Sequence, residues 1–309
     1  PRRFGKGYAA WDGKLLCSLP GLSLQEENDT MLSIPFTKGA FVLITFCTLF
    51  SGSSGNASVL RTENGALLID CGMSGKQVLA ALQAAHIAPA ELRAVLVTHE
   101  HSDHVKGVGV IARKLNLPVY ATAGTWEGMS GAVGEISAAH QVLVEPGESF
   151  FMLDGLEVNP FSIPHDANEP VGYRIYLPGG SSIAVATDLG YFSETVRDAV
   201  LGANVVLLES NHDPDLLKQN PHYPSALKSR ILGRKGHLSN ASGASAAVEL
   251  LNAGARHLLL GHLSSENNTP EMAFQTSKAA LENEGARVGS DVTLHVASRY
   301  QPSVVYTIR

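Results

Sequence analysis

Four side chains that can bind metal ions fall within six consecutive residues of this 309-residue chain. His99, His101, Asp103 and His104 directly follow the apolar run 94–97, which predicts a strand. In an extended loop, His99 and His101 point to the same side and can share one ion, while the following turn can direct Asp103 and His104 at another. Imidazole and carboxylate are the usual ligands of catalytic zinc sites, which keep one position open for water. This segment therefore predicts a metal centre at a strand end.

Four further candidates stand alone in the chain, each after an apolar strand-like run. They are Asp70, His165, Asp188 and His262. Taken singly, such a residue is more often structural than functional. In a layered α/β fold, however, strand ends gather the chemistry at one edge, so we expect these four to approach the histidine cluster.

In this order the residues resemble the metal signature of the metallo-β-lactamase-fold hydrolase superfamily, which begins with HxHxDH. The resemblance runs from residue 42 to the C-terminus and implies an α/β fold, a four-layer αβ/βα sandwich. It implies that one divalent ion takes His99, His101 and His165, and that a second takes Asp103, His104 and His262, with Asp188 shared. Asp103 would thereby take part in catalysis, and Asp70 would orient a ligand without being one.

Two such ions imply hydrolysis by a metal-bound hydroxide that attacks a carbonyl carbon or phosphorus. In the true β-lactamases of the superfamily, the position of Asp188 is not a bridging carboxylate. The resemblance therefore favours the phosphodiesterase, thioesterase and lactonase branches, with β-lactam hydrolysis as no more than a weak side activity. Zinc is the metal we expect, with manganese as an alternative, because imidazole and carboxylate accept several divalent metals.

A basic window favours phosphodiester chemistry on a chain whose net charge is −6. No acidic residue lies between Asp215 and Glu249, and such a window suits contacts with phosphates. The alternative is an ordinary solvated surface. The window contains Lys218, Lys228, Arg230, Arg234 and Lys235.

The same window ends at a predicted helix start. Ser239 or Asn240 is a good N-cap for a helix from about Ala241, and its free amides would favour a phosphate oxygen. His237 would stand beside them, placed to donate a proton to the leaving oxygen. We also expect His212 to face the site, so that His212, Ser239, Asn240, Arg234 and Lys235 are the predicted substrate-binding residues.

Part of the chain resembles a narrower family, the YycJ (WalJ)-type exodeoxyribonucleases. This resemblance implies a 5′-directed DNA exonuclease associated with repair that uses zinc or manganese. A glyoxalase-like thioesterase or lactonase is the alternative, and a non-catalytic metal-binding module is disfavoured because the ligand set is complete. The segment 51–56 could cradle an anion or form a plain turn. The matching stretches are 49–56, 209–213, 223–224, 227–231 and 236–240.

Composition places the chain among ordinary globular proteins. The content of 44% hydrophobic residues excludes disorder, and the longest apolar run, Phe41–Phe50, is too short to span a membrane. Three widely spaced cysteines favour a reducing compartment and predict a cytoplasmic protein. A signal peptide from Met31 is disfavoured because no basic cluster directly precedes its apolar core.

The pattern of apolar runs predicts one catalytic domain over residues 42–309 after a loosely ordered or accessory extension over 1–41. The oligomeric state stays open, with a homodimer among the alternatives. Hairpin turns are expected at 63–65, 154–155 and 178–180. Helices are expected at 77–85, 105–115, 194–201, 241–252 and 271–284. Strands are expected at 41–49, 67–69, 94–97, 119–121, 142–144, 183–186, 205–208, 257–260 and 292–296.

Overall fold

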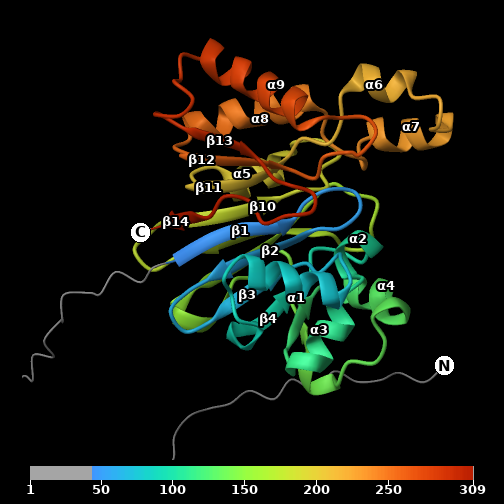
Figure 1. Cartoon of the computed structure of the whole chain (residues 1–309), viewed down its shortest axis with the longest axis vertical. Coiled ribbons are helices and arrows are strands. Elements are labelled where there is room, and N and C mark those ends of the chain that lie inside the picture. The colour runs from blue at the N-terminus through green and yellow to red at the C-terminus, as the bar shows by residue number, and fades with distance from the viewer. Residues whose placement is uncertain (1–43, 309) are drawn as a thin grey trace, which may run out of the picture. The chain divides into compact units, whose positions relative to one another are not determined.

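Two seven-stranded sheets face each other at the centre of the part of the chain described by this computed structural model, residues 44–308 (Figure 1). The first has the order β14-β1-β2-β3-β4-β5-β6 and the second β13-β12-β11-β10-β9-β8-β7. The strands of the first are Ile44–Phe50 (β1), Ala57–Arg61 (β2), Ala66–Ile69 (β3), Leu92–Leu96 (β4), Val119–Ala121 (β5), Gln141–Leu143 (β6) and Tyr306–Ile308 (β14). Those of the second are Phe150–Phe151 (β7), Glu157–Ser162 (β8), Val171–Tyr176 (β9), Ser182–Ala186 (β10), Val205–Glu209 (β11), His257–Gly261 (β12) and Thr293–Val296 (β13).

Helices cover the outer face of each sheet, which makes four layers. The helices associated with the first sheet are Gly75–Ala84 (α1), Ser102–Val105 (α2), Val108–Leu115 (α3) and Ala123–Val133 (α4). Those in the second half are Glu194–Val200 (α5), Pro214–Gln219 (α6), Ser225–Leu232 (α7), Asn240–Asn252 (α8) and Pro270–Asn283 (α9). The predicted αβ/βα sandwich is confirmed.

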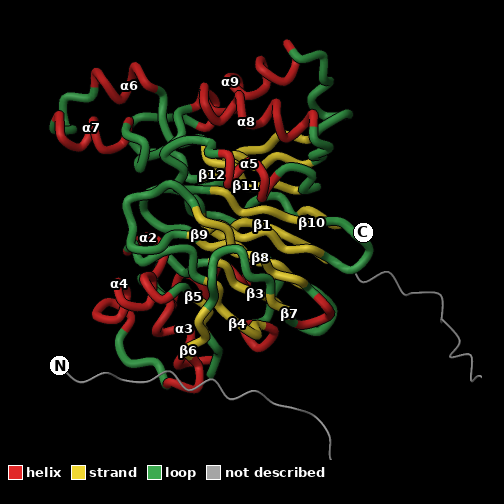
Figure 2. The backbone as a smooth tube through the Cα atoms, turned by 180° about the vertical axis from the view of Figure 1, so that it is seen from behind, coloured by secondary structure: helices red, strands yellow, loops and turns green. Residues whose placement is uncertain are grey.

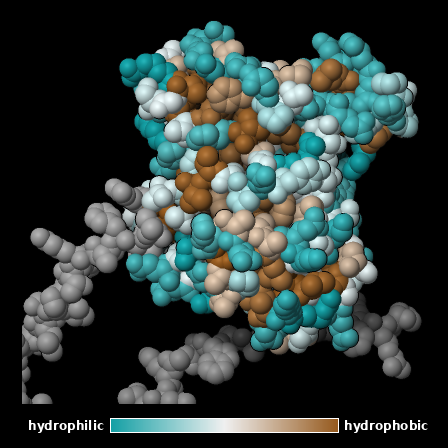
Figure 3. All heavy atoms as spheres, viewed as in Figure 1, coloured by the Kyte–Doolittle hydropathy of each residue, from teal (hydrophilic) through white to brown (hydrophobic). Residues whose placement is uncertain are grey.

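Helices α6 and α7 stand apart from α8 and α9 at one side of the second sheet (Figure 2). Their surface in the space-filling view is mainly hydrophilic (Figure 3). This pair therefore adds little to the core and instead places the chain between β11 and α8 at the surface.

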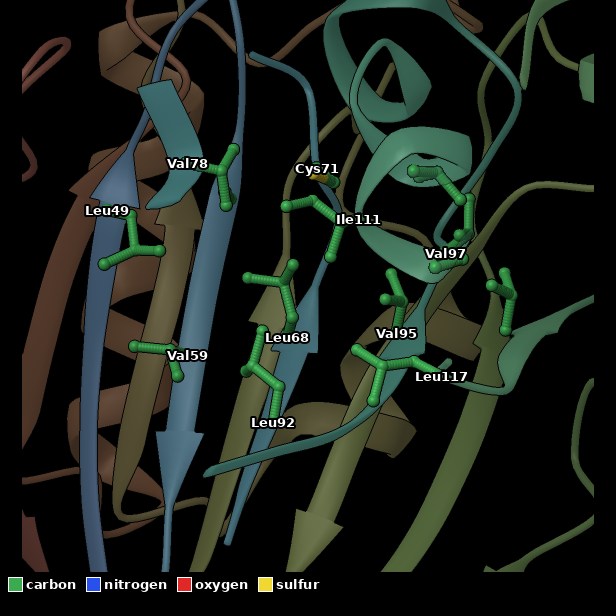
Figure 4. Close-up of a cluster of buried hydrophobic side chains, with 14 of the residues drawn as sticks. Leu49, Val59, Leu68, Cys71, Val78, Leu92, Val95, Val97, Ile111 and Leu117 are labelled. Atoms are coloured by element: carbon green, nitrogen blue, oxygen red, sulfur yellow. The ribbon is translucent and has the colours of Figure 1, made fainter. Parts of the chain in front are cut away.

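The core follows the two-residue period of the strands, because both faces of each sheet are buried. Val59 and Leu68 point outward, where they join Val78 of α1 and Ile111 of α3 in one apolar cluster (Figure 4). The alternate residues of the same strands point inward against the second sheet, as Leu60 and Leu67 do against Tyr173 and Leu207. This packing fixes the strand ends on which the polar residues lie.

Parallel pairing brings those ends to a common edge. Strands β3, β4, β5 and β6 run parallel to one another, as do β10, β11, β12 and β13. Asp70, the segment 97–104, Asp188 and His262 each begin within two residues of the end of a strand of these two parallel groups. This confirms the prediction that the strand ends bring the candidate residues together at one edge.

Each of the nine expected strands and five expected helices has a counterpart, with shifts of a few residues at their ends. The three expected turns join antiparallel neighbours: β2 to β3, β7 to β8, and β9 to β10. Strands β2, β8 and β9 were not expected, because Ser58, Pro160 and Arg174 interrupt their apolar pattern. Helix α4 was not expected either, since Gly128 and Gly131 lie inside it.

Residues 1–43 and 309 lie outside the described part, so the extension over 1–41 and the domain boundary near residue 42 stay predictions. The apolar run considered as the core of a signal peptide forms β1 from Ile44 onward. Among residues 44–308, no helix combines the length and the apolar character needed to cross a membrane. Cys47 and Cys71 are buried and form no disulfide, and burial raises the pKa of the Cys47 thiol to about 11.

Tyr173 provides a test of the contact between the two sheets. Its buried hydroxyl donates to the carbonyl oxygen of Val97, 2.8 Å away. Tyr173→Phe removes that donor, so we expect the free energy of unfolding to fall by about 1–2 kcal/mol, as measured by urea unfolding. Tyr120→Phe is the control, because the Tyr120 ring stacks on Phe150 while its hydroxyl has no hydrogen-bond partner among residues 44–308. An equal loss in the control would contradict the assignment.

Candidate metal centre

Three imidazole rings meet where the loop after β4 faces the loop after β8. His99 and His101 project from the first loop, with His99 Nε2 3.1 Å from His101 Nδ1. His165 comes from the second loop, and its Nε2 lies 3.3 Å from the same His101 nitrogen. Each ring offers one nitrogen within 4.8 Å of the other two, a spacing that one ion could bridge. The structure thus unites the three residues expected to share an ion.

A second group forms beside the first, at the start of α2. Asp103 and His104 lie in the first turn of this helix, with His104 Nε2 3.6 Å from Asp103 Oδ2. His262, which follows β12, places its Nε2 3.5 Å from the same carboxylate oxygen. The ligand atoms of this group also lie within 4.8 Å of one another. The second expected set is therefore brought together as well.

Asp188 lies between the two groups. Its Oδ2 is 3.4 Å from His104 Nε2, and its Oδ1 is 3.8 Å from His165 Nε2. Oδ2 is buried and accepts no hydrogen bond among the described residues. A buried carboxylate oxygen without a donor is unusual, and a cation would satisfy it.

Three residues at this edge adopt a left-handed backbone conformation directly after their strands. The φ angles are 60° at Asp70, 62° at Asp188 and 57° at His262. Asp and His are among the residues that enter this region more often, yet it is uncommon for any residue but glycine. Backbone conformations of this kind persist where the surrounding structure enforces them, and they cluster at functional sites.

Asp70 orients His104. Its carboxylate accepts hydrogen bonds from the backbone N–H of Thr98 at 2.8 Å and from the Thr98 hydroxyl. The same carboxylate lies 2.8 Å from His104 Nδ1, which assigns the proton to that nitrogen. His104 Nε2 is left to face Asp103 and Asp188. This is the role expected for Asp70, and Thr98 was not foreseen as its partner.

Glu209 is a functional candidate to which the sequence analysis assigned no role. It ends β11, is fully buried, and places Oε1 2.8 Å from His237 Nδ1 and 2.9 Å from His262 Nδ1. Its other oxygen accepts the backbone N–H groups of Leu189 and Leu238. The signal was present in the sequence, because a carboxylate after the apolar run 205–208 is the same pattern that singled out Asp70.

Asn56 is the second residue that was missed, and it lies at the end of segment 51–56. Its Nδ2 lies 3.1 Å from His104 Nε2, and its backbone N–H donates to the carbonyl of Asp103. The amides of Gly52 and Gly55 are bonded within the segment itself. The segment therefore forms a turn that supports Asp103 and His104.

The charges in this cluster are strongly coupled. Burial opposes protonation of His104, but Asp188, Asp70 and Asp103 outweigh it and raise the pKa of His104 to about 9. Burial likewise opposes protonation of His262, and Asp188, Asp103 and Glu209 hold its pKa well above the usual range. The buried carboxylates thus favour the protonated form of both rings.

This donor set fits divalent metal ions. Among the described residues, imidazole and carboxylate groups form four overlapping groups of ligand atoms, and two of these groups include Asp188. Such ions prefer these ligands, and their binding replaces protons. The orphaned oxygen of Asp188 lies between the clusters. Divalent metal binding is accordingly the chemistry that the arrangement supports.

Some of the positive charges of the basic window are paired with carboxylates in the structure. Arg230 forms an ion pair with Asp166, next to His165, and Lys218 lies 3.8 Å from Asp215. Two of the five charges of the expected basic patch are thus paired, because acidic residues from outside or at the border of the window approach them. Arg234 and Lys235 stay exposed, with the Arg234 guanidinium stacked 4.1 Å from the ring centre of Tyr191.

The helix start at α8 is as expected in one respect and different in another. Ser239 is the N-cap, and its hydroxyl accepts the N–H of Ser242 at 3.2 Å. Asn240 is buried, with its side chain bonded to Asn268 and Ser210, so a direct contact between the Asn240 side chain and substrate is not supported. His212 pairs with Ser239 in a short bridge, and both its ring nitrogens are buried without a partner among the described residues.

Comparisons with known proteins agree with this geometry. The family description "Beta-lactamase superfamily domain" matches residues 66–263. The exodeoxyribonuclease YycJ of Bacillus anthracis is 37% identical over 84% of this chain and 97% of its own length. The exodeoxyribonuclease WalJ of Streptococcus pneumoniae serotype 2 is 38% identical over 82% of this chain and 94% of its own.

The chain belongs to the YycJ/WalJ family of the β-lactamase superfamily. The crystal structure of the metallo-β-lactamase fold protein YhfI from Bacillus subtilis shares the fold, with a TM-score of 0.64 at 17% identity over 86% of this chain and 99% of that one. Both expected resemblances are thus confirmed. Both relatives carry the name exodeoxyribonuclease, which supports the metal-dependent hydrolase of the nuclease class that the sequence predicted.

Asp70 gives the sharpest test of how this family's metal centre is held. In Asp70→Asn, an amide N–H replaces an acceptor that faces Thr98 and His104, so His104 loses its fixed orientation. We expect metal affinity to fall about 10–100-fold, the usual effect of losing a partner that orients a ligand. Competition with a chromophoric chelator measures this change. Unaltered affinity at full folding would show that Asp70 does not support the ligands.

Proposed function

We propose that this protein is a DNA phosphodiesterase that uses two divalent metal ions and removes nucleotides from the 5′ end. The observation that carries this proposal is the position of His237 beside the metal-ligand clusters. Its ring centre lies 5.1 Å from the ring centres of both His165 and His262, and Glu209 fixes its Nδ1. The similarity to curated exodeoxyribonucleases over most of the chain supports the choice of DNA.

The proposed ligands divide as the clusters do. One ion would be held by His99, His101 and His165, the other by Asp103, His104 and His262, with Asp188 between them. Zinc suits this set best, and manganese is the alternative. Divalent ions at such a site activate water at neutral pH and stabilise the negative charge that develops on a phosphate.

His237 would supply the proton for the leaving oxygen. Because Nδ1 is bonded to Glu209, Nε2 is the nitrogen left for the substrate. The imidazole is only partly exposed, at 16% of its side-chain surface, so it is oriented by the protein and still accessible. Glu209 would hold both His237 and His262 in place, linking the proton donor to a proposed metal ligand.

Arg234 and Lys235 would bind the DNA backbone near this site. They lie on the segment that leads to His237, and their exposed charges contrast with the net charge of −6 of the whole chain. Ser239 and the start of α8 stand at the end of the same segment. We also propose a cytoplasmic location, which the buried, unpaired Cys47 and Cys71 support.

The deciding experiment is digestion of end-labelled DNA. Single- and double-stranded DNA labelled at either end, and matching RNA, would be incubated with the zinc- and manganese-loaded protein. We expect mononucleotide release from the 5′ end that stops when a chelator removes the metal. Turnover of a thioester or lactone with inert bis(p-nitrophenyl) phosphate would instead identify the carbon-centred alternative.

His237→Ala tests the proton donor. We expect turnover of DNA to slow at least tenfold, as general acid catalysis usually contributes 10²–10⁴-fold, while metal content stays at about two ions per chain. Metal content by mass spectrometry separates the roles, since loss of an ion would make His237 a ligand. His140→Ala, at the start of β6 and away from the carboxyl ends of the strands, is the matched control and should keep full activity.

The double variant Arg234→Ala with Lys235→Ala tests the DNA contact. Each lost phosphate contact removes about one unit from the slope of log affinity against log salt, so the slope should become shallower by about one to two units. Fluorescence anisotropy of labelled DNA at several salt concentrations gives the slope. An unchanged slope would place both charges away from the substrate.

A further inference from the structure

A cavity of about 420 Å³ opens on the loop that follows His262. Three segments enclose it: the turn after β1, the connection from β12 to α9, and the residues after β13. No acidic residue lines it, and hydroxyl groups and one guanidinium dominate its polar side chains. These are Ser51, Ser264, Ser265, Thr269, Ser298 and Arg299.

Arg299 brings a positive charge that the described residues do not neutralise. One of its terminal nitrogens, Nη2, donates to the carbonyl of Leu263 at 3.1 Å, but no carboxylate of residues 44–308 forms an ion pair with it. Its Nε is buried without an acceptor. A half-buried guanidinium with unused donors is best satisfied by an anion, and its planar fork matches phosphate oxygens.

The hydroxyl groups around it can donate as well. Ser51 Oγ accepts the N–H of His262 at 2.9 Å, and Ser264 Oγ accepts the N–H of Asn267 at 3.2 Å. A hydroxyl that accepts still carries a proton, and neither proton has an acceptor among the described residues. The cavity thus presents donors from several sides, the pattern that positions a phosphate.

The cavity shares its supports with the metal centre. Ser51 holds the backbone of His262, and Arg299 holds the next carbonyl along the same loop. Gly52 lies against the Arg299 side chain, where a Cβ would come within 3.1 Å of Nε. A ligand here would therefore lie beside the metal centre, separated from it by the loop 262–264.

We propose that this cavity binds a backbone phosphate of the DNA strand whose scissile bond lies at the metal centre, with Arg299 as its main contact. The proposal rests on the nuclease function proposed above and adds a determinant of substrate length. A strand long enough to reach the cavity is fixed in register, whereas a small diester without a second phosphate gains nothing from it.

Arg299→Gln is the first test. Steady-state kinetics on an oligonucleotide and on bis(p-nitrophenyl) phosphate give the preference for DNA as a ratio of kcat/KM values. We expect this ratio to fall about tenfold, through KM for DNA, since a charge-assisted hydrogen bond is lost. An unchanged ratio, with both substrates affected equally, would make Arg299 a support of the loop and overturn the proposal.

A second test variant and a control variant accompany Arg299→Gln. Ser265→Asp adds a negative charge at an exposed position of the cavity, so it should lower the same ratio without disturbing the core. Arg93→Gln removes a positive charge at the amino end of β4, where Arg93 bonds to backbone carbonyls, and should leave the ratio unchanged. A normal ratio in Ser265→Asp, or an equal fall in Arg93→Gln, would contradict the site.

A binding measurement separates this proposal from the nuclease function. Inorganic phosphate is titrated into the zinc-loaded protein labelled with ¹⁵N-arginine, and the Nε resonance that Arg299→Gln removes is followed. We expect that resonance to shift and saturate. If the protein cleaves no DNA, the proposed function fails, but a resonance that does not respond to phosphate is what overturns the phosphate site.

Discussion

The burial of carboxylates beside imidazole rings is the constraint on which this structure depends. Removing such charges from water costs several kcal/mol for each ion unless each finds a partner. The Asp70 carboxylate is hydrogen-bonded to Thr98 and His104. The Glu209 carboxylate contacts the rings of His237 and His262 and accepts hydrogen bonds from two backbone N–H groups. Asp188 retains a buried oxygen, Oδ2, that accepts no hydrogen bond among the described residues. This oxygen lies beside the two ligand clusters, where a cation would satisfy it.

The like charges within this cluster of carboxylates and imidazole rings repel one another, so the surrounding fold must hold the side chains in place. The central strands of each sheet are buried on both faces, so apolar contacts hold them in place. Asp70, Asp188 and His262 then turn away from their strands in the left-handed conformation. Because the strands cannot shift to relieve these turns, the packing of the sheets maintains the geometry of the centre.

The sequence reveals this centre well because its elements obey simple periodic rules. An apolar run of four or five residues followed by Asp or His marks Asp70, Asp188 and His262 equally, and the structure brings all three together. The same rule would have found Glu209. It could not have found Asn56, because that side chain reaches His104 only through a turn whose path depends on tertiary contacts.

Charge was harder to predict than position, for a related reason. A window without acids in sequence says nothing about carboxylates that fold back on it, and Asp166 neutralises Arg230 from a different loop. The converse holds for Arg299, whose neighbours in sequence give no hint of a cavity. Which charged side chains form ion pairs therefore becomes clear only from the three-dimensional structure.

The loop before His237 is tied to the ligand-bearing loops at close range. A Cβ on Gly190 would come within 2.2 Å of the carbonyl oxygen of Arg234, so glycine lets these two segments touch. The carbonyl of Gly236 also lies 3.2 Å from His165 Nδ1, and Glu209 joins His237 to His262. The segment that carries Arg234 and Lys235 thus ends on the same residues that surround Asp188. A strand bound along it would be delivered to the metal centre in a fixed register, because the contacts that orient the ligands also position the proton donor.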